Sequence, residues 1–243
     1  MESRFTRTER VYGPDAVKKL AGSRVAVFGL GGVGGYALEA LARSGIGALD
    51  LVDHDVVSLS NFNRQILATC RTLGSFKADA AKERVYDINP DCLVTVHRTF
   101  FLPGTAGDWD FSHYDYIVDC VDTVTAKLLL AGMAKAAGVP IISAMGTGNK
   151  KNPSLLRVSD LYETSVCPLA RIMRKECRRR GIDRLKVVWS PEEPVQPFTD
   201  PEDGPDPSVP GSTAFVPASA GLLLAGEVVK DLIHFDHAAR EEA

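Results

Sequence analysis

The chain has 243 residues, of which 45% are hydrophobic and 24% charged, and its formal net charge is −3. These values are ordinary for a soluble globular protein with one large α/β domain, and they indicate neither DNA binding nor attraction to an anionic membrane. The five cysteines are scattered and form no C-x-x-C pair, which argues against a disulfide framework or paired-cysteine zinc site and favours reduced thiols in the cytoplasm.

Short apolar runs alternate with segments of helical spacing over residues 1–145. Gly22, Gly138 and the pair Asn89-Pro90 close three of the helical segments. Strands alternating with helices of this length predict the Rossmann-like α/β class, a mostly parallel sheet with helices on both faces. The predicted strands are 25–28, 49–52, 93–96, 116–119 and 140–143, and the predicted helices are 13–22, 36–43, 75–88 and 124–137.

Residues 146–243 form an extension of different composition, which we expect to belong to the same single domain, 1–243. A strongly basic helix is predicted at 166–181, followed by a strand at 186–189 and a C-terminal helix at 217–234. Between them, residues 191–211 contain seven prolines and six acidic residues but no Lys or Arg. Such a segment cannot bury a core, so we predict a mobile loop.

The apolar C-terminal helix has three interpretations: core packing, a dimer face, or contact with a membrane surface. Its apolar stretch is broken by Glu227 and is too short to span a bilayer. Core packing or a dimer face is therefore favoured.

A glycine-rich segment follows the first predicted strand and opens the next predicted helix, with glycines at 29, 31, 32 and 34. These glycines allow a tight turn and close backbone approach, so that helix N–H groups can meet a phosphate. Asp53 ends the next strand, where a carboxylate can bind ribose hydroxyls. The combination predicts a nucleotide site, although an NAD enzyme would show the same features.

Polar residues after the second strand distinguish between these nucleotides. The stretch from Asp53 to Gln65 contains Asp55, Asn61, Asn63 and Arg64, and Lys77 follows shortly after. An NAD site needs neutral space here, whereas an ATP-cleaving site needs Arg and Lys for the triphosphate charge and carboxylates that can hold Mg²⁺. The cluster therefore favours ATP.

These motifs together resemble the ThiF/MoeB/HesA superfamily of ubiquitin-activating-like enzymes. The resemblance rests on the glycine segment, Asp53-x-Asp55, Ser60-Asn61-x-Asn63-Arg64-Gln65, Lys77 and Asp119-Cys-Val-Asp122. It implies a ThiF-type fold in which a substrate carboxylate attacks the α-phosphate of ATP to give an acyl-adenylate.

The resemblance also implies roles for individual residues. Asp53 would bind ribose, and Asp122 would hold Mg²⁺ as the essential acid. Arg7 would reach into the site of a partner subunit in a homodimer. Arg64 and Lys77 would bind the phosphates, and the implied catalytic residues are Asp122, Arg64, Lys77 and Arg7. The implied ATP-binding residues are Gly29, Gly31, Gly32, Gly34, Asp53, Asp55, Asn61, Asn63, Arg64, Gln65, Lys77 and Asp122.

The second half is similar to the branch that dehydrates threonylcarbamoyladenosine in tRNA. Matching stretches begin at Asn149, Ser159, Cys167, Lys186 and Phe215. The sulphur-carrier and ubiquitin-activating members carry paired zinc cysteines, which this chain lacks. The branch therefore implies ATP-dependent cyclisation of the modified adenosine. The alternative is an adenylyltransferase that acts on the C-terminal carboxylate of a sulphur-carrier protein. A cysteine desulfurase or another sulphur-transfer partner is left open.

A tRNA substrate needs a basic surface, and the predicted basic helix offers one. Eight Lys or Arg residues lie between residues 171 and 186, against two acidic ones. The alternative is an ordinary solvated helix face. The candidate tRNA-binding residues are Arg171, Arg174, Lys175, Arg178, Arg179 and Arg180.

Three further features have a structural alternative that we prefer or leave open. Cys167 precedes the basic helix but has no neighbouring His, so a buried thiol is favoured over a catalytic one. His54 is interpreted as a neighbour of the site. Residues 147–149 follow a strand end, where they could line the site or bind a monovalent cation.

Overall fold

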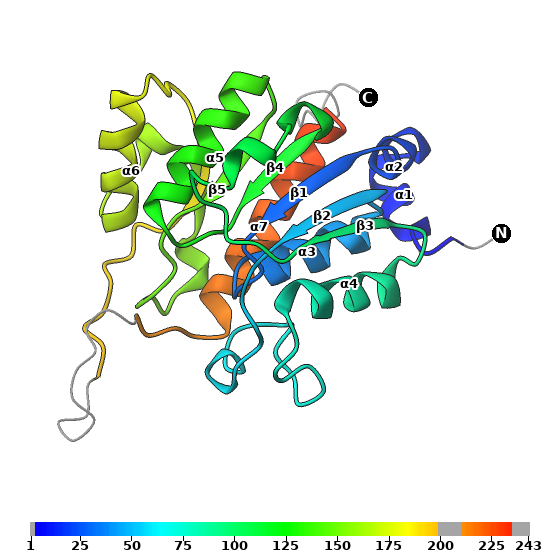
Figure 1. Cartoon of the computed structure of the whole chain (residues 1–243), viewed down its shortest axis with the longest axis horizontal. Helices are drawn as coiled ribbons and strands as arrows, with labels where there is room; N and C mark the ends of the chain where they lie inside the picture. Colours follow the sequence, from blue (N-terminus) through cyan, green and yellow to red (C-terminus); the bar gives the residue numbers. More distant parts are fainter. Residues whose placement is uncertain (1–2, 199–209, 235–243) are drawn as a thin grey trace.

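The computed structural model describes residues 3–198 and 210–234. Seven strands form one sheet in the order β3-β2-β1-β4-β5-β7-β6; Figure 1 labels β1 to β5 of this sheet. All neighbouring strands are parallel except β6, which pairs antiparallel with β7. The strands are β1 (Arg24–Phe28), β2 (Ala48–Val52), β3 (Leu93–His97), β4 (Tyr116–Asp119), β5 (Ile141–Ala144), β6 (Arg157–Asp160) and β7 (Lys186–Trp189).

Helices cover both faces of this sheet, because alternate strand residues point to opposite sides. Val25 and Val27 pack into the cluster formed with α3 (Gly34–Ser44), α4 (Lys77–Ile88) and α7 (Phe215–Leu232). Ala26 and Phe28 pack on the other side, against α5 (Val124–Ala137). The basic helix α6 (Pro168–Arg179) packs on α5 and β7 through Ala170, Met173 and Cys177. The predicted α/β fold with helices on both faces is confirmed.

The C-terminal helix α7 lies in the core, as the sequence favoured. It packs closely on α3, and a Cβ at Gly221 would lie 2.3 Å from the carbonyl oxygen of Val33. The helix begins at Phe215, two residues before the predicted start, since Pro217 is tolerated in a first turn. Within residues 3–198 and 210–234, none of the helices has the length and hydropathy needed to cross a bilayer.

Several elements escaped the sequence analysis. Helix α1 (Thr6–Tyr12) buries none of its residues, so it has no apolar periodicity to reveal it. Helix α2 (Pro14–Ala21) follows it directly and was predicted, at 13–22. Strand β6 is half-exposed at the sheet edge, which also hides its pattern. Short 3₁₀ turns occupy Leu59–Asn61, Ala106–Asp108, Phe111–His113, Pro153–Leu155 and Leu161–Glu163.

The strand register brings the predicted site residues to one edge. Phe28 pairs with Val52 on one side and Asp119 on the other, so β1, β2 and β4 end level. From β1 the chain adds β2 and β3 on one side of the sheet, and it then returns to place β4 on the other side of β1, so the strand order switches between β1 and β4. In open α/β sheets, ligands bind outside the carboxyl ends of the strands at such a point.

Candidate active site at the carboxyl edge of the sheet

A cavity of about 600 Å³ opens at this edge, between the ends of β1 and β4. Ten of the twelve residues predicted to bind ATP line it, together with residues 144–148 and 210–212. Gly34 and Asn63 do not line it, and neither does Arg7. The ten are Gly29, Gly31, Gly32, Asp53, Asp55, Asn61, Arg64, Gln65, Lys77 and Asp122.

The glycine segment forms a turn with no room for a side chain at Gly29 or Gly34. A Cβ at Gly34 would lie 1.8 Å from the carbonyl oxygen of Gly29. Gly29 itself has a φ of +85°, and a Cβ there would lie 2.7 Å from the carbonyl oxygen of Cys120. Gly34 is thus needed for the turn rather than for contact with a ligand, and the turn leads the N-terminus of α3 to the cavity, where free N–H groups favour an anion.

Asp53 holds the glycine segment in place. One carboxylate oxygen accepts the N–H of Leu30 at 2.7 Å and the other accepts the N–H of Asp55 at 2.8 Å. The residue is 8% exposed. Each carboxylate oxygen can accept a second hydrogen bond, so Asp53 can shape the turn and still accept a hydroxyl from the cavity.

The polar segment 55–77 places cations beside the glycines. Lys77, at the start of α4, is 5% exposed, and its Nζ lies 2.6 Å from Oδ2 of Asp55. Arg64 donates to the carbonyl oxygen of Ser60 and to Oδ1 of Asn63, both at 2.9 Å. A Cβ at Gly32 would lie 3.4 Å from Cγ of Arg64, so the arginine stem packs directly on the glycine turn.

Two amides in this segment have different surroundings. Oδ1 of Asn61 accepts the N–H of Ser58 at 3.0 Å, which orders the turn. Gln65 is 7% exposed, and its Oε1 is buried without a hydrogen-bond partner among the described residues. A buried amide oxygen without a partner is costly, and a ligand donor in the cavity would relieve that cost.

Asp122 follows the end of β4 and is exposed at the cavity. Its carboxylate has no side-chain partner within the described part of the chain. A free carboxylate beside a phosphate-sized turn suits a hard cation such as Mg²⁺. The cluster of Asp53, His54 and Asp55 also brings three potential ligand atoms within 4.8 Å, but Asp53 already accepts backbone N–H groups and Asp55 pairs with Lys77.

No activated nucleophile lies among the cavity residues. Cys120 lines the cavity, but burial raises the pKa of its thiol far above the ordinary value. Cys167 is 1% exposed and lies under Gly146, whose Cβ would be 3.6 Å from its sulphur. His54 pairs with Asp55 at 3.2 Å and packs edge-on against Phe100. These contacts agree with the structural interpretations preferred for Cys167 and His54.

The sequence analysis missed two parts of the cavity wall. Thr99, Phe100 and Phe101 line it just after β3, and their place beyond a strand end was the available signal. Residues 210–212, at the end of the predicted loop 191–211, also line the cavity and had no local signal. The loop's central residues, 199–209, lie outside the described residues.

Asn149 and Asn63 tie this second part to the rest of the wall. Asn149 donates its N–H to the carbonyl oxygen of Gly211 at 2.8 Å and accepts the N–H of Gly211 at 2.6 Å on Oδ1. Its carbonyl oxygen accepts the N–H of Val195 at 2.7 Å. Nδ2 of Asn63 donates to the carbonyl oxygen of Ser212 at 3.1 Å, so Asn63 closes the wall instead of facing the cavity.

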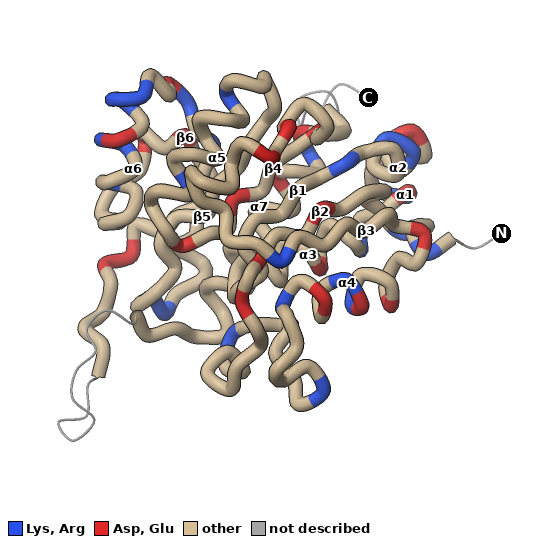
Figure 2. Tube along the Cα trace, in the orientation of Figure 1, with Lys and Arg blue, Asp and Glu red and all other residues tan. Residues whose placement is uncertain are grey.

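The predicted tRNA-binding residues lie on α6. Figure 2 shows this helix at the edge of the molecule, with both basic and acidic residues along it. Arg171 and Lys175 are exposed and, among the described residues, their side chains have no ion-pair or hydrogen-bond partner. Arg174 donates to Thr164, Arg178 stacks on Tyr162, and Arg179 and Arg180 pair with Glu176. Leu169, in the first turn of α6, lines the cavity, so the helix leads away from the cavity mouth.

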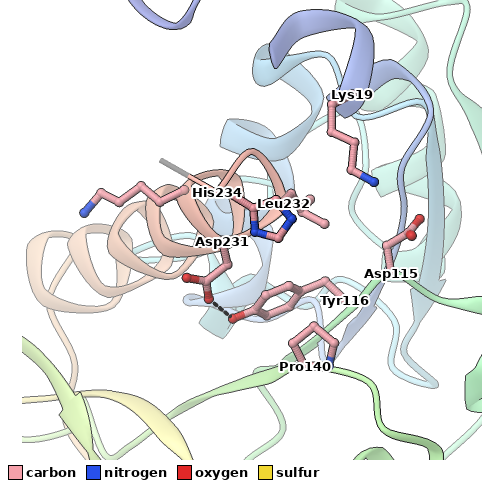
Figure 3. Close-up of a pocket in the computed structure, with 8 residues that line it drawn as sticks. Lys19, Asp115, Tyr116, Pro140, Asp231, Leu232 and His234 are labelled. Atoms are coloured by element: carbon pink, nitrogen blue, oxygen red, sulfur yellow. Dashed lines mark hydrogen bonds between the residues drawn. The ribbon is translucent and has the colours of Figure 1, made fainter. Parts of the chain in front are cut away.

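A second hollow of about 560 Å³ lies at the opposite edge of the sheet, where β4 begins (Figure 3). The hydroxyl of Tyr116 donates to Asp231 at 2.6 Å, and Lys186 donates to the same carboxylate at 2.8 Å. These bonds hold the last turn of α7 on the sheet. Because Tyr116 and Lys186 are already hydrogen-bonded to Asp231, we interpret this hollow as a structural contact between α7 and the sheet.

The family model described as the ThiF family matches residues 4–242. The tRNA threonylcarbamoyladenosine dehydratase of Bacillus subtilis is 38% identical, over 96% of both chains. The crystal structure of the E. coli tRNA N6-threonylcarbamoyladenosine dehydratase, TcdA, in complex with AMP has a TM-score of 0.87 at 33% identity and covers 98% of this chain and 96% of that one; its complex with ATP has a TM-score of 0.86.

A relative named as an adenylyltransferase and sulfurtransferase is also similar to this chain. The adenylyltransferase and sulfurtransferase uba4 of Aspergillus niger is 39% identical over 212 residues, which cover 87% of this chain but 40% of uba4.

Proposed function

Because the chain belongs to the ThiF family, we propose that it catalyses the ATP-dependent dehydration and cyclisation of N6-threonylcarbamoyladenosine in tRNA through an acyl-adenylate. The observation that carries this function is one cavity that unites a phosphate-sized glycine turn, two cations and a free carboxylate, in a chain similar along nearly its whole length to dehydratases. The whole chain would act as one ThiF-type domain.

The chemistry needs no protein nucleophile. The substrate carboxylate attacks the α-phosphate of ATP, the bond to pyrophosphate breaks, and an acyl-adenylate forms. A nitrogen or oxygen of the same side chain then attacks the acyl carbon and AMP leaves, so that the nucleoside has lost one water. Holding both reactants in one cavity replaces bimolecular encounter by a positioned reaction, and this agrees with the raised pKa that burial gives to the thiol of Cys120, the cysteine among the described residues that line the cavity.

Charge stabilisation is the main task left to the protein. Arg64 and Lys77 would neutralise the triphosphate, and Asp53 would accept ribose hydroxyls. Gln65 would offer its unpartnered oxygen to a ligand donor. Asp55 would hold Lys77 until phosphate replaces it as the partner.

Asp122 is the residue best suited to hold Mg²⁺ with ATP, since its carboxylate is exposed at the cavity and unpaired among the described residues. The ion would supply charge neutralisation to the phosphates. The monovalent cation expected near residues 147–149 has less support, because the side-chain and main-chain oxygens of Asn149 already accept hydrogen bonds.

Substrate tRNA would approach along α6. Arg171 and Lys175 are one helical turn apart and both free to meet phosphates, while Arg174, Arg178, Arg179 and Arg180 have partners that would have to rearrange. The helix begins at the cavity mouth and extends roughly 18 Å, at about 1.5 Å per residue. It could therefore contact the backbone on one side of a modified nucleoside held in the cavity.

A homodimer would explain Arg7. This residue is exposed on α1 and does not line the cavity of its own subunit. We propose that it completes the cavity of a second copy. Cytoplasmic location and a sulphur-transfer partner stay predictions that no contact in the structure addresses.

The function is tested with tRNA from cells that lack the endogenous activity. The protein is incubated with ATP, Mg²⁺ and this tRNA, and mildly digested nucleosides are analysed by mass spectrometry. We expect ATP-dependent loss of one water from threonylcarbamoyladenosine, absent with Asp122→Ala. An unchanged nucleoside would contradict the dehydratase function, and adenylation of a sulphur-carrier C-terminus would then support the alternative.

A further inference from the structure

A buried ion pair lies directly beneath the carboxyl end of β4. Nζ of Lys127, on α5, is 3.1 Å from each carboxylate oxygen of Asp119 and 3.3 Å from Oγ of Ser143 on β5. Ser143 also donates its hydroxyl to Asp119. The Lys127 and Asp119 side chains are each 1% exposed, and Ser143 is fully buried, so no ligand in the cavity can touch Lys127.

Stability alone does not account for these charges. Removing a carboxylate and an ammonium from water costs several kcal/mol per ion, and apolar side chains of similar volume are often as stable. The surroundings are the apolar residues of a sheet core, which would accept such side chains. The buried pair therefore calls for an explanation in the backbone that it holds.

That backbone is the segment 120–123, which carries Asp122 along the cavity wall. Oδ1 of Asp119 accepts the N–H of Val121 at 3.2 Å. On its other side, the segment contacts Gly29, where a Cβ would lie 2.8 Å from the carbonyl carbon of Cys120. The turn is thus held between the glycine segment and the Asp119 carboxylate.

Among the described residues, no hydrogen bond or ion pair orients the Asp122 side chain. Its carboxylate is exposed and, in the described chain, no side chain pairs with it. The position of its backbone therefore decides where the carboxylate lies. We propose that Asp119, held by Lys127 and Ser143, is a positioning residue that sets the direction of Asp122 in the cavity.

This inference rests on the proposed function, in which Asp122 is essential. It is tested with two double variants that both remove the buried charges. Asp119→Asn with Lys127→Met keeps an oxygen that can accept the Val121 N–H, whereas Asp119→Leu with Lys127→Met does not. Lys127→Met preserves the length of the side chain in both.

We expect the leucine variant to lose kcat by about 100-fold, the effect of misplacing a catalytic group by about 1 Å, and to bind MgATP as weakly as Asp122→Ala does. The asparagine variant should stay within about tenfold of the wild type. In the absence of ligand, the Val121 amide should exchange hydrogen faster in the leucine variant only. Equal kcat for the two variants, whether both high or both low, would overturn the proposal.

A single variant covers the case in which a double variant does not fold. Ser143→Ala removes one bond to Asp119 and leaves both charges in place. It should lower kcat by about 3- to 10-fold, less than in the leucine variant, because Lys127 still holds Asp119 and Asp119 still accepts the Val121 N–H. An unchanged kcat in a folded Ser143→Ala protein would contradict the inference.

Failure of the proposed function is visible separately, because wild-type protein would then leave the tRNA nucleoside unchanged. The variants are in that case compared through binding of MgATP, with Asp122→Ala as the reference. The leucine variant should lose as much affinity as Asp122→Ala, and the asparagine variant should not. Wild-type affinity in the leucine variant would sink the positioning role whatever the reaction is.

Discussion

Nζ of Lys77 lies 2.6 Å from Oδ2 of Asp55 at the mouth of the cavity. The lysine side chain is 7% exposed and the aspartate side chain 49% exposed, so the pair is asymmetric. The lysine is held under the surface and its partner can turn to solvent. A triphosphate can therefore replace Asp55 as the partner of Lys77 without moving the lysine.

Lys77→Ala should raise KM for ATP by about 10- to 100-fold, because a lost hydrogen bond between charged groups costs about 1.5–3 kcal/mol. Lys82→Ala is the matched control, since Lys82 lies on the same helix and contacts Tyr86 instead of the cavity. Steady-state kinetics with ATP as the varied substrate gives both constants. Similar KM values for the two variants would contradict the role of Lys77.

Charge removal on α6 should weaken tRNA binding and lower its salt dependence. In the double variant Arg171→Ala and Lys175→Ala, the slope of log K against log salt should fall by about 0.7–0.9 per lost phosphate contact. The control is Lys18→Ala with Lys19→Ala on α2, on the far side of the molecule in Figure 1. Filter binding at several salt concentrations measures the slopes, and equal slopes in both variants would count against α6 as the contact.

Two glycines of α7 should respond in opposite ways to alanine. Gly221→Ala would bring a Cβ within 2.3 Å of the carbonyl oxygen of Val33 and should destabilise the protein by about 1–3 kcal/mol. Gly226→Ala meets nothing within 4 Å and should stabilise it by about 0.5–1 kcal/mol, because alanine is the better helix former. Thermal unfolding reports both, and a higher Tm for Gly221→Ala would show that α3 and α7 do not pack as closely as described.

Acidification should remove the contribution that Asp50, in the middle of β2, makes to the free energy of unfolding. Burial alone would raise the pKa of this carboxyl group, but hydrogen bonds from His97 and Arg24 outweigh burial and lower it. A lowered folded-state pKa contributes stability that is present above the unfolded value, about 4, and is lost as the pH falls through the folded value.

Asp50→Asn should therefore cost about 1–3 kcal/mol at pH 7, and the difference from the wild type should shrink below about pH 4. Urea unfolding at pH 7, 5, 4 and 3 measures it. Asp91→Asn is the control, because the Asp91 side chain is 85% exposed and its pair with Arg4 contributes little. A difference for Asp50→Asn that grows on acidification would contradict this assignment.

The segments of the cavity that could be predicted from the sequence are those marked by a pattern of neighbouring residues. The glycines at 29–34 follow a run of apolar residues and precede a helix, and that order alone predicts a phosphate turn. Asp53, Asp55 and Lys77 were found for the same reason, since each lies at the end of a strand or the start of a helix. Even Gly34 was found, although its task is to pass Gly29 closely rather than to touch a ligand.

Partners distant in sequence could not be predicted in this way. Asp119 was predicted only as part of a motif, and Asp50 only as a strand residue. The packing of α5, β3 and the amino end of β1 is needed to reveal what they bind. Residues 210–212 are held at the cavity wall by hydrogen bonds with Asn149 and Asn63. The proline-rich, acidic composition of the segment that precedes them does not indicate these contacts.

The sequence by itself determined the alternation of strands and helices and the glycine turn, because dihedral preferences and apolar periodicity act between residues near in the chain. Only the tertiary structure decided which polar groups were buried and paired. A buried charge or amide is stable only where another segment brings it a partner, and that meeting depends on the whole sheet order rather than on any one stretch of chain.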